Sequence, residues 1–153
     1  MGGISRHSKI LVVDVYAAVD IPLVHIADTA AQAIQAKGLD VVGLLGTRFT
    51  MQRDFYKGRL VEKFGIEVLV PDEDEQQLVD DVIFKELVLG VVKEESRLAY
   101  KQIVAKLVAR GAQGIILGCT ELPMLVKPED SLVSLFDTTT LHAMMAVEMA
   151  LAE

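Results

Sequence analysis

Short apolar runs alternate with longer amphipathic segments along most of this chain. The apolar runs have the composition of buried strands and lie at 41–45, 66–70, 114–117 and 132–136. The segments with helical periodicity lie at 30–37, 50–64, 73–89, 94–110 and 138–151. This alternation predicts an α/β fold with a mainly parallel sheet flanked by helices.

Some of the predicted helices have recognisable ends. Asp28 and Thr29 are residue types that cap the start of a helix, and Thr50 is expected to open the next helix in the same way. Gly65 is placed to end that second helix. Residues 10–13 have strand composition, but the structure of the first nineteen residues is left open.

Composition narrows the class of protein. The chain has 153 residues, which is the size of one domain, and 52% of them are hydrophobic. We expect this apolar content to form a buried sheet and a subunit interface, and therefore a homo-oligomer. The net charge of −7 argues against nucleic-acid binding. No apolar run is long enough for a membrane helix, so no membrane partner is expected.

The single cysteine favours a reducing compartment, and the N-terminus has no secretory pattern, so we expect a cytoplasmic protein. The sequence contains no glycine-rich dinucleotide motif, no phosphate-binding loop and no cluster with metal-ligand spacing. We therefore expect neither a cofactor nor a metal.

Cys119 is the first candidate for chemistry. The apolar run 114–117 stops at Gly118, and Cys119, Thr120 and Glu121 follow. Ligands of open α/β sheets bind outside the carboxyl ends of the strands, where Cys119 would lie. Backbone and hydroxyl donors beside the sulfur are expected to lower the pKa of the thiol. The alternative is that Cys119 is a small buried core residue.

The segment 118–123 resembles the second catalytic-cysteine motif of the aspartate/glutamate racemase family. The members of this family are cofactor-independent amino-acid racemases. Further blocks follow the family's order, at 20–28, 42–51, 54–57 and 136–139 with His142. The resemblance therefore covers most of the chain. It implies proton transfer at the α-carbon of aspartate or glutamate by thiols, with an isomerase activity.

The resemblance also implies roles for individual residues. Cys119 matches a catalytic thiol, and the predicted substrate contacts are Thr47, Thr120, Glu121 and Thr138. Structural alternatives stay open for several of them. Thr47 is equally a helix-entry residue, and Glu121 either sets the proton affinity of the thiol or forms a local salt bridge. Asp137 is equally a helix cap, and His25 and His142 are expected to be structural.

The chain departs from the family in one respect. Family members have two similar lobes, each with one catalytic cysteine, but only one cysteine occurs here. We interpret residues 1–19 as a remnant of the first lobe and 20–153 as a racemase-like α/β domain with a C-terminal helix. A two-base racemase that lacks one base cannot racemise by the family route, so the chain alone is expected to be inactive. The alternative function is a non-catalytic lobe that binds a small carboxylate or pairs with a full-length racemase subunit.

In that family the last helix packs toward the first lobe. The apolar residues of the predicted helix 138–151 are therefore expected to lack this partner and to be covered by a second chain. These residues are Leu141, Met144, Met145, Val147 and Leu151.

Overall fold

A computed structural model describes residue 18 and residues 20–152 of the chain. The predicted remnant at 1–19, including the ambiguous 10–13, lies almost entirely outside the described residues. The strands are β1 (Val41–Leu45), β2 (Glu67–Leu69), β3 (Gly114–Leu117) and β4 (Ser134–Asp137). The α-helices are α2 (Ile26–Ala36), α3 (Arg48–Gln52), α4 (Asp54–Phe64), α5 (Glu73–Lys85), α6 (Glu94–Ala109), α7 (Leu122–Leu125) and α8 (Thr138–Leu151), and two 3-10 turns are η1 (Leu87–Leu89) and η2 (Pro128–Asp130).

The four strands form one parallel sheet in the order β2-β1-β3-β4. The two central strands are the most apolar, and every residue of β3 is buried. Parallel strands buried on both faces read as continuous apolar runs, which is why the sequence pattern identified them. The predicted α/β fold with a parallel sheet flanked by helices is confirmed.

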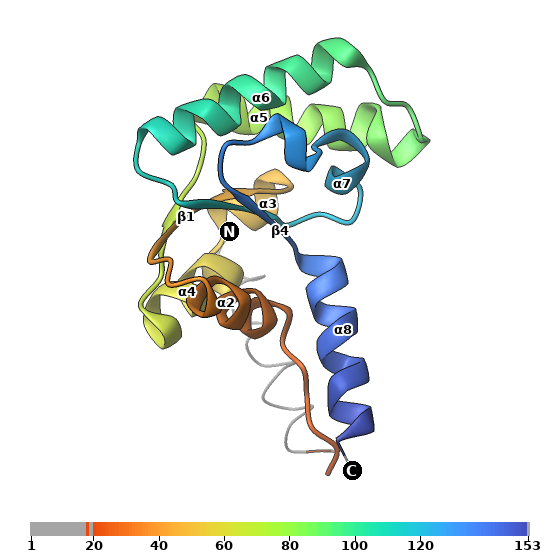
Figure 1. Cartoon of the computed structure of the whole chain (residues 1–153). Helices are drawn as coiled ribbons and strands as arrows, with labels where there is room; N and C mark the ends of the chain where they lie inside the picture. The colour runs from red at the N-terminus through yellow and green to blue at the C-terminus, as the bar shows by residue number, and fades with distance from the viewer. Residues whose placement is uncertain (1–17, 19, 153) are drawn as a thin grey trace.

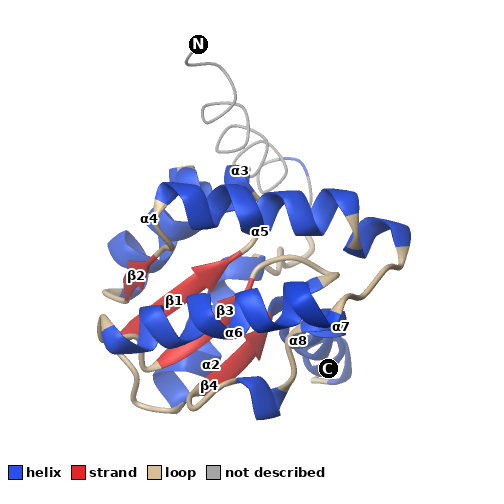
Figure 2. Cartoon of the chain, turned by 90° about the horizontal axis from the view of Figure 1, so that it is seen from above, coloured by secondary structure: helices blue, strands red, loops and turns tan. Residues whose placement is uncertain are grey.

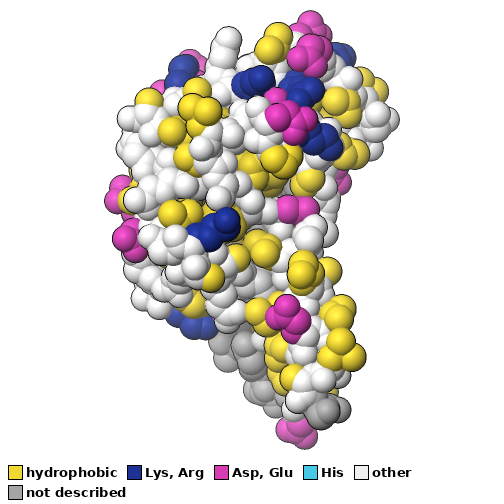
Figure 3. Space-filling model, viewed as in Figure 1, with side chains coloured by type: hydrophobic (Ala, Val, Ile, Leu, Met, Phe, Trp, Pro, Cys, Tyr) yellow, Lys and Arg dark blue, Asp and Glu magenta, His cyan; other side chains and the backbone are white. Residues whose placement is uncertain are grey.

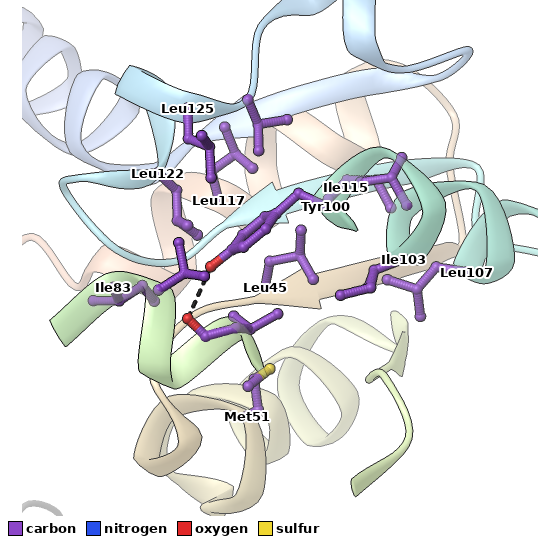
Figure 4. Close-up of a cluster of buried hydrophobic side chains, with 14 of the residues drawn as sticks. Leu45, Met51, Ile83, Tyr100, Ile103, Leu107, Ile115, Leu117, Leu122 and Leu125 are labelled. Carbon is purple, nitrogen blue, oxygen red and sulfur yellow. Dashed lines mark hydrogen bonds between the residues drawn. The ribbon is translucent and has the colours of Figure 1, made fainter. Parts of the chain in front are cut away.

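Helices cover both faces of the sheet. Helices α5 and α6 lie on one face, and α2 and α4 lie on the other (Figure 1). Figure 2 shows the strands side by side beneath α5 and α6. Each face has its own core, and the cluster under α5 and α6 surrounds the buried ring of Tyr100 (Figure 4). The second core joins α2 and α4 to the opposite face of β1 and β3.

The structure corrects two predicted helix starts. Helix α2 begins earlier than expected, because the ring Nδ1 of His25 accepts the amide of Ala27 and caps the helix in place of Asp28 or Thr29. Thr47 caps α3, so Thr50 lies inside a helix rather than opening one.

Other boundaries differ by a few residues. The predicted helix 50–64 is two helices, separated at Arg53, which has extended backbone angles. Gly65 ends α4 with a φ of 68°, as expected. The predicted helix 73–89 stops being α-helical after Lys85 and continues as η1.

Helix α8 projects away from the sheet, and α2 packs against it (Figure 1). Hydrophobic side chains line the projecting part of α8 in the space-filling view (Figure 3). Met144, Val147 and Leu151 are 56%, 57% and 79% exposed. The described residues leave these three side chains largely uncovered, as predicted. No helix among the described residues has the length and apolar character needed to cross a membrane.

Candidate active site

Three strand ends come together at the carboxyl edge of the sheet. Leu45 of β1 pairs with Leu117 of β3, and Leu117 pairs with Asp137 of β4. The residues that follow these ends in the chain include Thr47, Cys119 and Thr138. The sheet therefore brings these three predicted site residues to one edge, which is where ligands of open α/β sheets bind.

Two glycines allow the β1 and β3 loops to approach closely. The amide of Gly118 donates to the carbonyl oxygen of Leu45 at 2.7 Å. A Cβ atom on Gly118 would lie 3.0 Å from that oxygen, and one on Gly46 would lie 3.3 Å from the carbonyl oxygen of Gly118. Larger residues at these positions would push the two loops apart. The glycines thus set the position of Cys119 relative to β1.

Cys119 is half-buried and packs against the hydrophobic cluster under α6. Its thiol donates a hydrogen bond from Sγ to Oε2 of Glu121 at 2.8 Å. Burial, and then the hydrogen bond to Glu121, raise the pKa of the thiol to about 11. The backbone amides of Glu121 and Thr120 act in the opposite direction but are outweighed. The prediction of a lowered thiol pKa is therefore wrong for this structure, because the sequence did not reveal the apolar cluster that buries the sulfur, and because Glu121 accepts a hydrogen bond from the thiol.

Glu121 directly precedes α7, and its side chain is half-buried. Hydrogen bonds from Cys119 and then from the Thr120 side chain lower the pKa of its carboxyl group. Of the two interpretations of Glu121, an effect on the proton affinity of the thiol or a local salt bridge, this contact matches the first. The predicted substrate contacts of Thr120 and Glu121 stay predictions. Thr120 itself is exposed at the edge of the sheet.

Thr47 is the N-cap of α3. Its Oγ1 accepts the amide of Thr50 at 3.4 Å and lies 3.1 Å from the Thr50 hydroxyl. The helix-entry interpretation of Thr47 is thus confirmed, and a substrate contact stays a prediction. The start of α3 is also held from α5, because Oδ1 of Asp80 accepts the amide of Arg48 at 2.7 Å.

Thr138 is buried, with 2% of its surface exposed. Its hydroxyl donates to the carbonyl oxygen of Leu117 at 3.0 Å, which joins the start of α8 to the end of β3. Asp137 caps α8 by accepting the amides of Thr139 and Thr140. The predicted contact of Thr138 with substrate stays a prediction, and its visible role is to connect two elements at the site.

Both histidines of the matched blocks make structural contacts. His25 caps α2, and burial together with the positive charge of Arg59 lowers the pKa of its ring. Nε2 of His142 lies 2.9 Å from the carbonyl oxygen of Val24. These contacts agree with the structural interpretation of both side chains. No group of three or more His, Cys, Asp and Glu side chains within the described residues is placed to hold a metal ion.

Sequence reasoning missed Tyr100. This residue of α6 is fully buried in the cluster against which Cys119 packs, and its hydroxyl donates to the carbonyl oxygen of Val79 at 2.8 Å (Figure 4). Its spacing from Ile103, Val104 and Leu107 follows the i, i+3, i+4, i+7 pattern of a buried helix face, and that was the available signal.

An open hollow of about 380 Å³ lies near the ends of β1 and β2, lined by Met51, Gln52, Lys57, Val70, Glu73 and Gln76.

Comparison with known proteins identifies the family. Residues 4–146 match the Asp/Glu/Hydantoin racemase family, and the chain belongs to it. A protein assigned as an Asp/Glu racemase in Yersinia pestis is 46% identical, with a TM-score of 0.89, and the match covers 99% of this chain and 64% of that chain. An aspartate racemase homologue from Pyrococcus horikoshii OT3 is 37% identical, with a TM-score of 0.84, and the match covers 94% and 63%.

One more solved structure agrees on the fold, and one more relative matches in sequence. The aspartate racemase of Picrophilus torridus is 21% identical, with a TM-score of 0.65, over 82% of this chain and 52% of that one. An uncharacterized protein in the pnlA 3′ region of Pectobacterium carotovorum subsp. carotovorum is 31% identical over 107 residues, which is 70% of this chain and 69% of the relative. The chain therefore spans just under two thirds of the Yersinia and Pyrococcus proteins.

Proposed function

We propose that this chain carries one side of a cofactor-independent amino-acid racemase site of the aspartate/glutamate type, with Cys119 as the thiol that transfers a proton at the α-carbon. The observation that carries the proposal is the position of Cys119 at the carboxyl edge of the sheet, in a chain that belongs to the racemase family. Only one cysteine is present in these 153 residues, so the chain supplies one of the two proton-transfer groups.

The proposed reaction requires polar donors beside such a thiol. Removal of an α-proton from an amino acid leaves a carbanion that spreads charge onto the carboxylate. An enzyme without pyridoxal phosphate must place a base against the Cα–H bond and supply hydrogen-bond donors for that charge. Thr47 and Thr120 carry hydroxyls in the two loops that meet at this edge, and we assign them to the substrate carboxylate. Glu121 and Thr138 are the further candidates for substrate contact.

The second proton-transfer group comes, in this proposal, from polypeptide beyond the described α/β domain. The Yersinia and Pyrococcus proteins are about half as long again as this chain, and the exposed apolar residues of α8 are available for packing. A second copy of the chain is our proposed occupant of this surface. A half-buried reduced thiol as the reacting group suits a reducing compartment, so we place the protein in the cytoplasm.

Exchange of the α-proton tests the proposal. Purified protein is incubated in D₂O with each enantiomer of aspartate and glutamate, and the α-proton is followed by NMR and the enantiomer ratio by chiral chromatography. Because one thiol serves one face of the substrate, the configuration is expected to stay unchanged where the protein is monomeric, and any exchange is expected to disappear in Cys119→Ser. Exchange that persists in Cys119→Ser would contradict the assignment of Cys119. Inversion by the purified monomer would contradict the one-sided site.

A further inference from the structure

The thiol of Cys119 and the carboxylate of Glu121 form a contact within one short loop. The two residues lie between β3 and α7, and Sγ of Cys119 donates to Oε2 of Glu121 at 2.8 Å. The bond fixes the direction of the S–H group. It also occupies the proton that a proton-transfer reaction would move.

Glu121 is an ionised acceptor in this contact. Its carboxylate receives hydrogen bonds from Cys119 and from the Thr120 side chain, and both lower the pKa of the carboxyl group. A carboxylate has no proton to donate to a thiolate. Loss of the thiol proton would therefore break the bond to Glu121 and leave two negative charges close together.

Both Glu121 and the apolar cluster around Cys119 favour the protonated form of the thiol. Cys119 packs against the cluster that contains Tyr100, Leu117 and Leu122, and this burial disfavours a charged sulfur. Tyr100 of α6 lies in the same cluster. Burial raises the pKa of its phenol far above the usual range, so Tyr100 stays neutral and adds no charge beside the thiol.

We propose that Glu121 is a positioning residue that fixes the Cys119 side chain and keeps the proton on its sulfur at neutral pH. The thiol thus rests in its proton-carrying form. A role of Glu121 in catalysis rests on the proposed function, but the coupling between Glu121 and Cys119 does not depend on any substrate. Glu121 is then a partner of the thiol rather than only a contact of the substrate.

The pH dependence of Cys119 alkylation tests the coupling directly. The rate constant for iodoacetamide is measured between about pH 6 and pH 10.5 for the wild-type protein and for Glu121→Gln, because the thiolate is the reacting form. We expect wild-type reactivity at pH 8 to lie well below that of a free thiol. In Glu121→Gln the pH profile is expected to shift downward by about one unit, which raises the rate at pH 8 about tenfold.

Three controls make the test specific. Glu95→Gln removes an exposed carboxylate at the start of α6 and should leave the profile unchanged. Glu121→Asp keeps the charge and should retain a profile closer to the wild type than Glu121→Gln does. Far-ultraviolet circular dichroism and thermal melting establish that each variant folds.

Two results would overturn the proposal. One is a wild-type thiol that titrates at or below about pH 8.5, the value of a free cysteine, and this measurement does not depend on any variant. The other is a folded Glu121→Gln protein whose alkylation profile matches the wild type. A shifted profile in a protein that shows no interaction with amino acids would support the role of Glu121 and would count against the proposed function alone.

Discussion

The amide of Gly118 donates a hydrogen bond of 2.7 Å to the carbonyl oxygen of Leu45, and this bond joins the loops that follow the two central strands. Thr47 and Cys119 lie one residue beyond the glycines of these loops. Thr47 is the candidate contact of the substrate carboxylate, and Cys119 is the candidate acid/base thiol. The distance between them therefore depends on how closely the backbones of the loops after β1 and β3 approach each other.

Substitution of Gly118 by alanine should disturb this approach. The added Cβ would lie 3.0 Å from the carbonyl oxygen of Leu45 and 3.1 Å from Cδ1 of Leu44. We expect a loss of about 1–3 kcal/mol of unfolding free energy, which is typical of overpacking, together with a changed alkylation rate at Cys119. Urea unfolding and iodoacetamide kinetics measure the two effects. An alanine variant with wild-type stability would show that the loops can separate at no cost.

The contact of Asp28 with Arg59 and Lys63 makes stability depend on pH. Burial alone would raise the pKa of Asp28, but hydrogen bonds from Arg59 and Lys63 outweigh it and lower the pKa to about 2. Since the folded-state pKa lies below the unfolded value of 3.8, the stabilisation is complete above pH 4 and is lost as the pH falls toward 2.

Asp28→Asn should therefore destabilise the protein by about 1–3 kcal/mol at pH 7, and this difference from the wild type should shrink between pH 4 and pH 2. Urea unfolding at several pH values measures it. Glu148→Gln, on the exposed part of α8, is the matched control and should change stability little. A deficit in Asp28→Asn that does not vary with pH would mean that the lost stability is not electrostatic.

The core under α6 should be sensitive to truncation. Leu107 is 1% exposed and packs in the cluster around Tyr100, whereas Leu132 is 96% exposed. Leu107→Ala is expected to cost about 2–5 kcal/mol through lost burial and a residual cavity. Leu132→Ala removes the same atoms from the surface and should change stability by less than about 0.5 kcal/mol. Similar losses for both variants in urea unfolding would refute the assignment of the core.

Self-association is the expected use of the exposed side of α8. Met144, Val147 and Leu151 follow helical spacing and share one side of the helix. The wild-type protein should form dimers at micromolar concentration, and the double variant Met144→Lys with Val147→Lys should be monomeric in sedimentation velocity. Ala146→Lys, on the opposite side, should still dimerise. A wild-type monomer at about 50 μM, far above the dissociation constant of a stable dimer, would rule out the second copy as the occupant.

The sequence predicted the positions of the strands and helices better than the chemical properties of the candidate site. The run 41–45 and the helix 138–151 were predicted with their observed limits, because local signals mark them: Gly46 follows the run, and Asp137 caps the helix. The division of α3 from α4 and the cap supplied by His25 were not predicted. The short helix α3 depends in part on a tertiary contact, because Asp80 of α5 accepts the amide of Arg48 at the start of α3.

The state of the thiol also depends on distant residues. The motif placed Cys119 at the edge of the sheet, but burial by the cluster around Tyr100 comes from a helix about twenty residues away in sequence, and it raises the thiol pKa. A short motif specifies which groups are adjacent along the chain. It does not specify the solvent exposure that decides whether those groups ionise.

Protection of Cys119 by amino acids tests the proposed site most directly. The rate of iodoacetamide modification is measured at pH 9 with increasing concentrations of each enantiomer of aspartate and glutamate, with lysine and alanine as controls and with mass spectrometry to confirm the modified residue. The proposed function predicts saturable slowing of the reaction by at least one dicarboxylic amino acid and no slowing by lysine. A rate that none of these compounds changes would contradict the assignment of Cys119 to an amino-acid site.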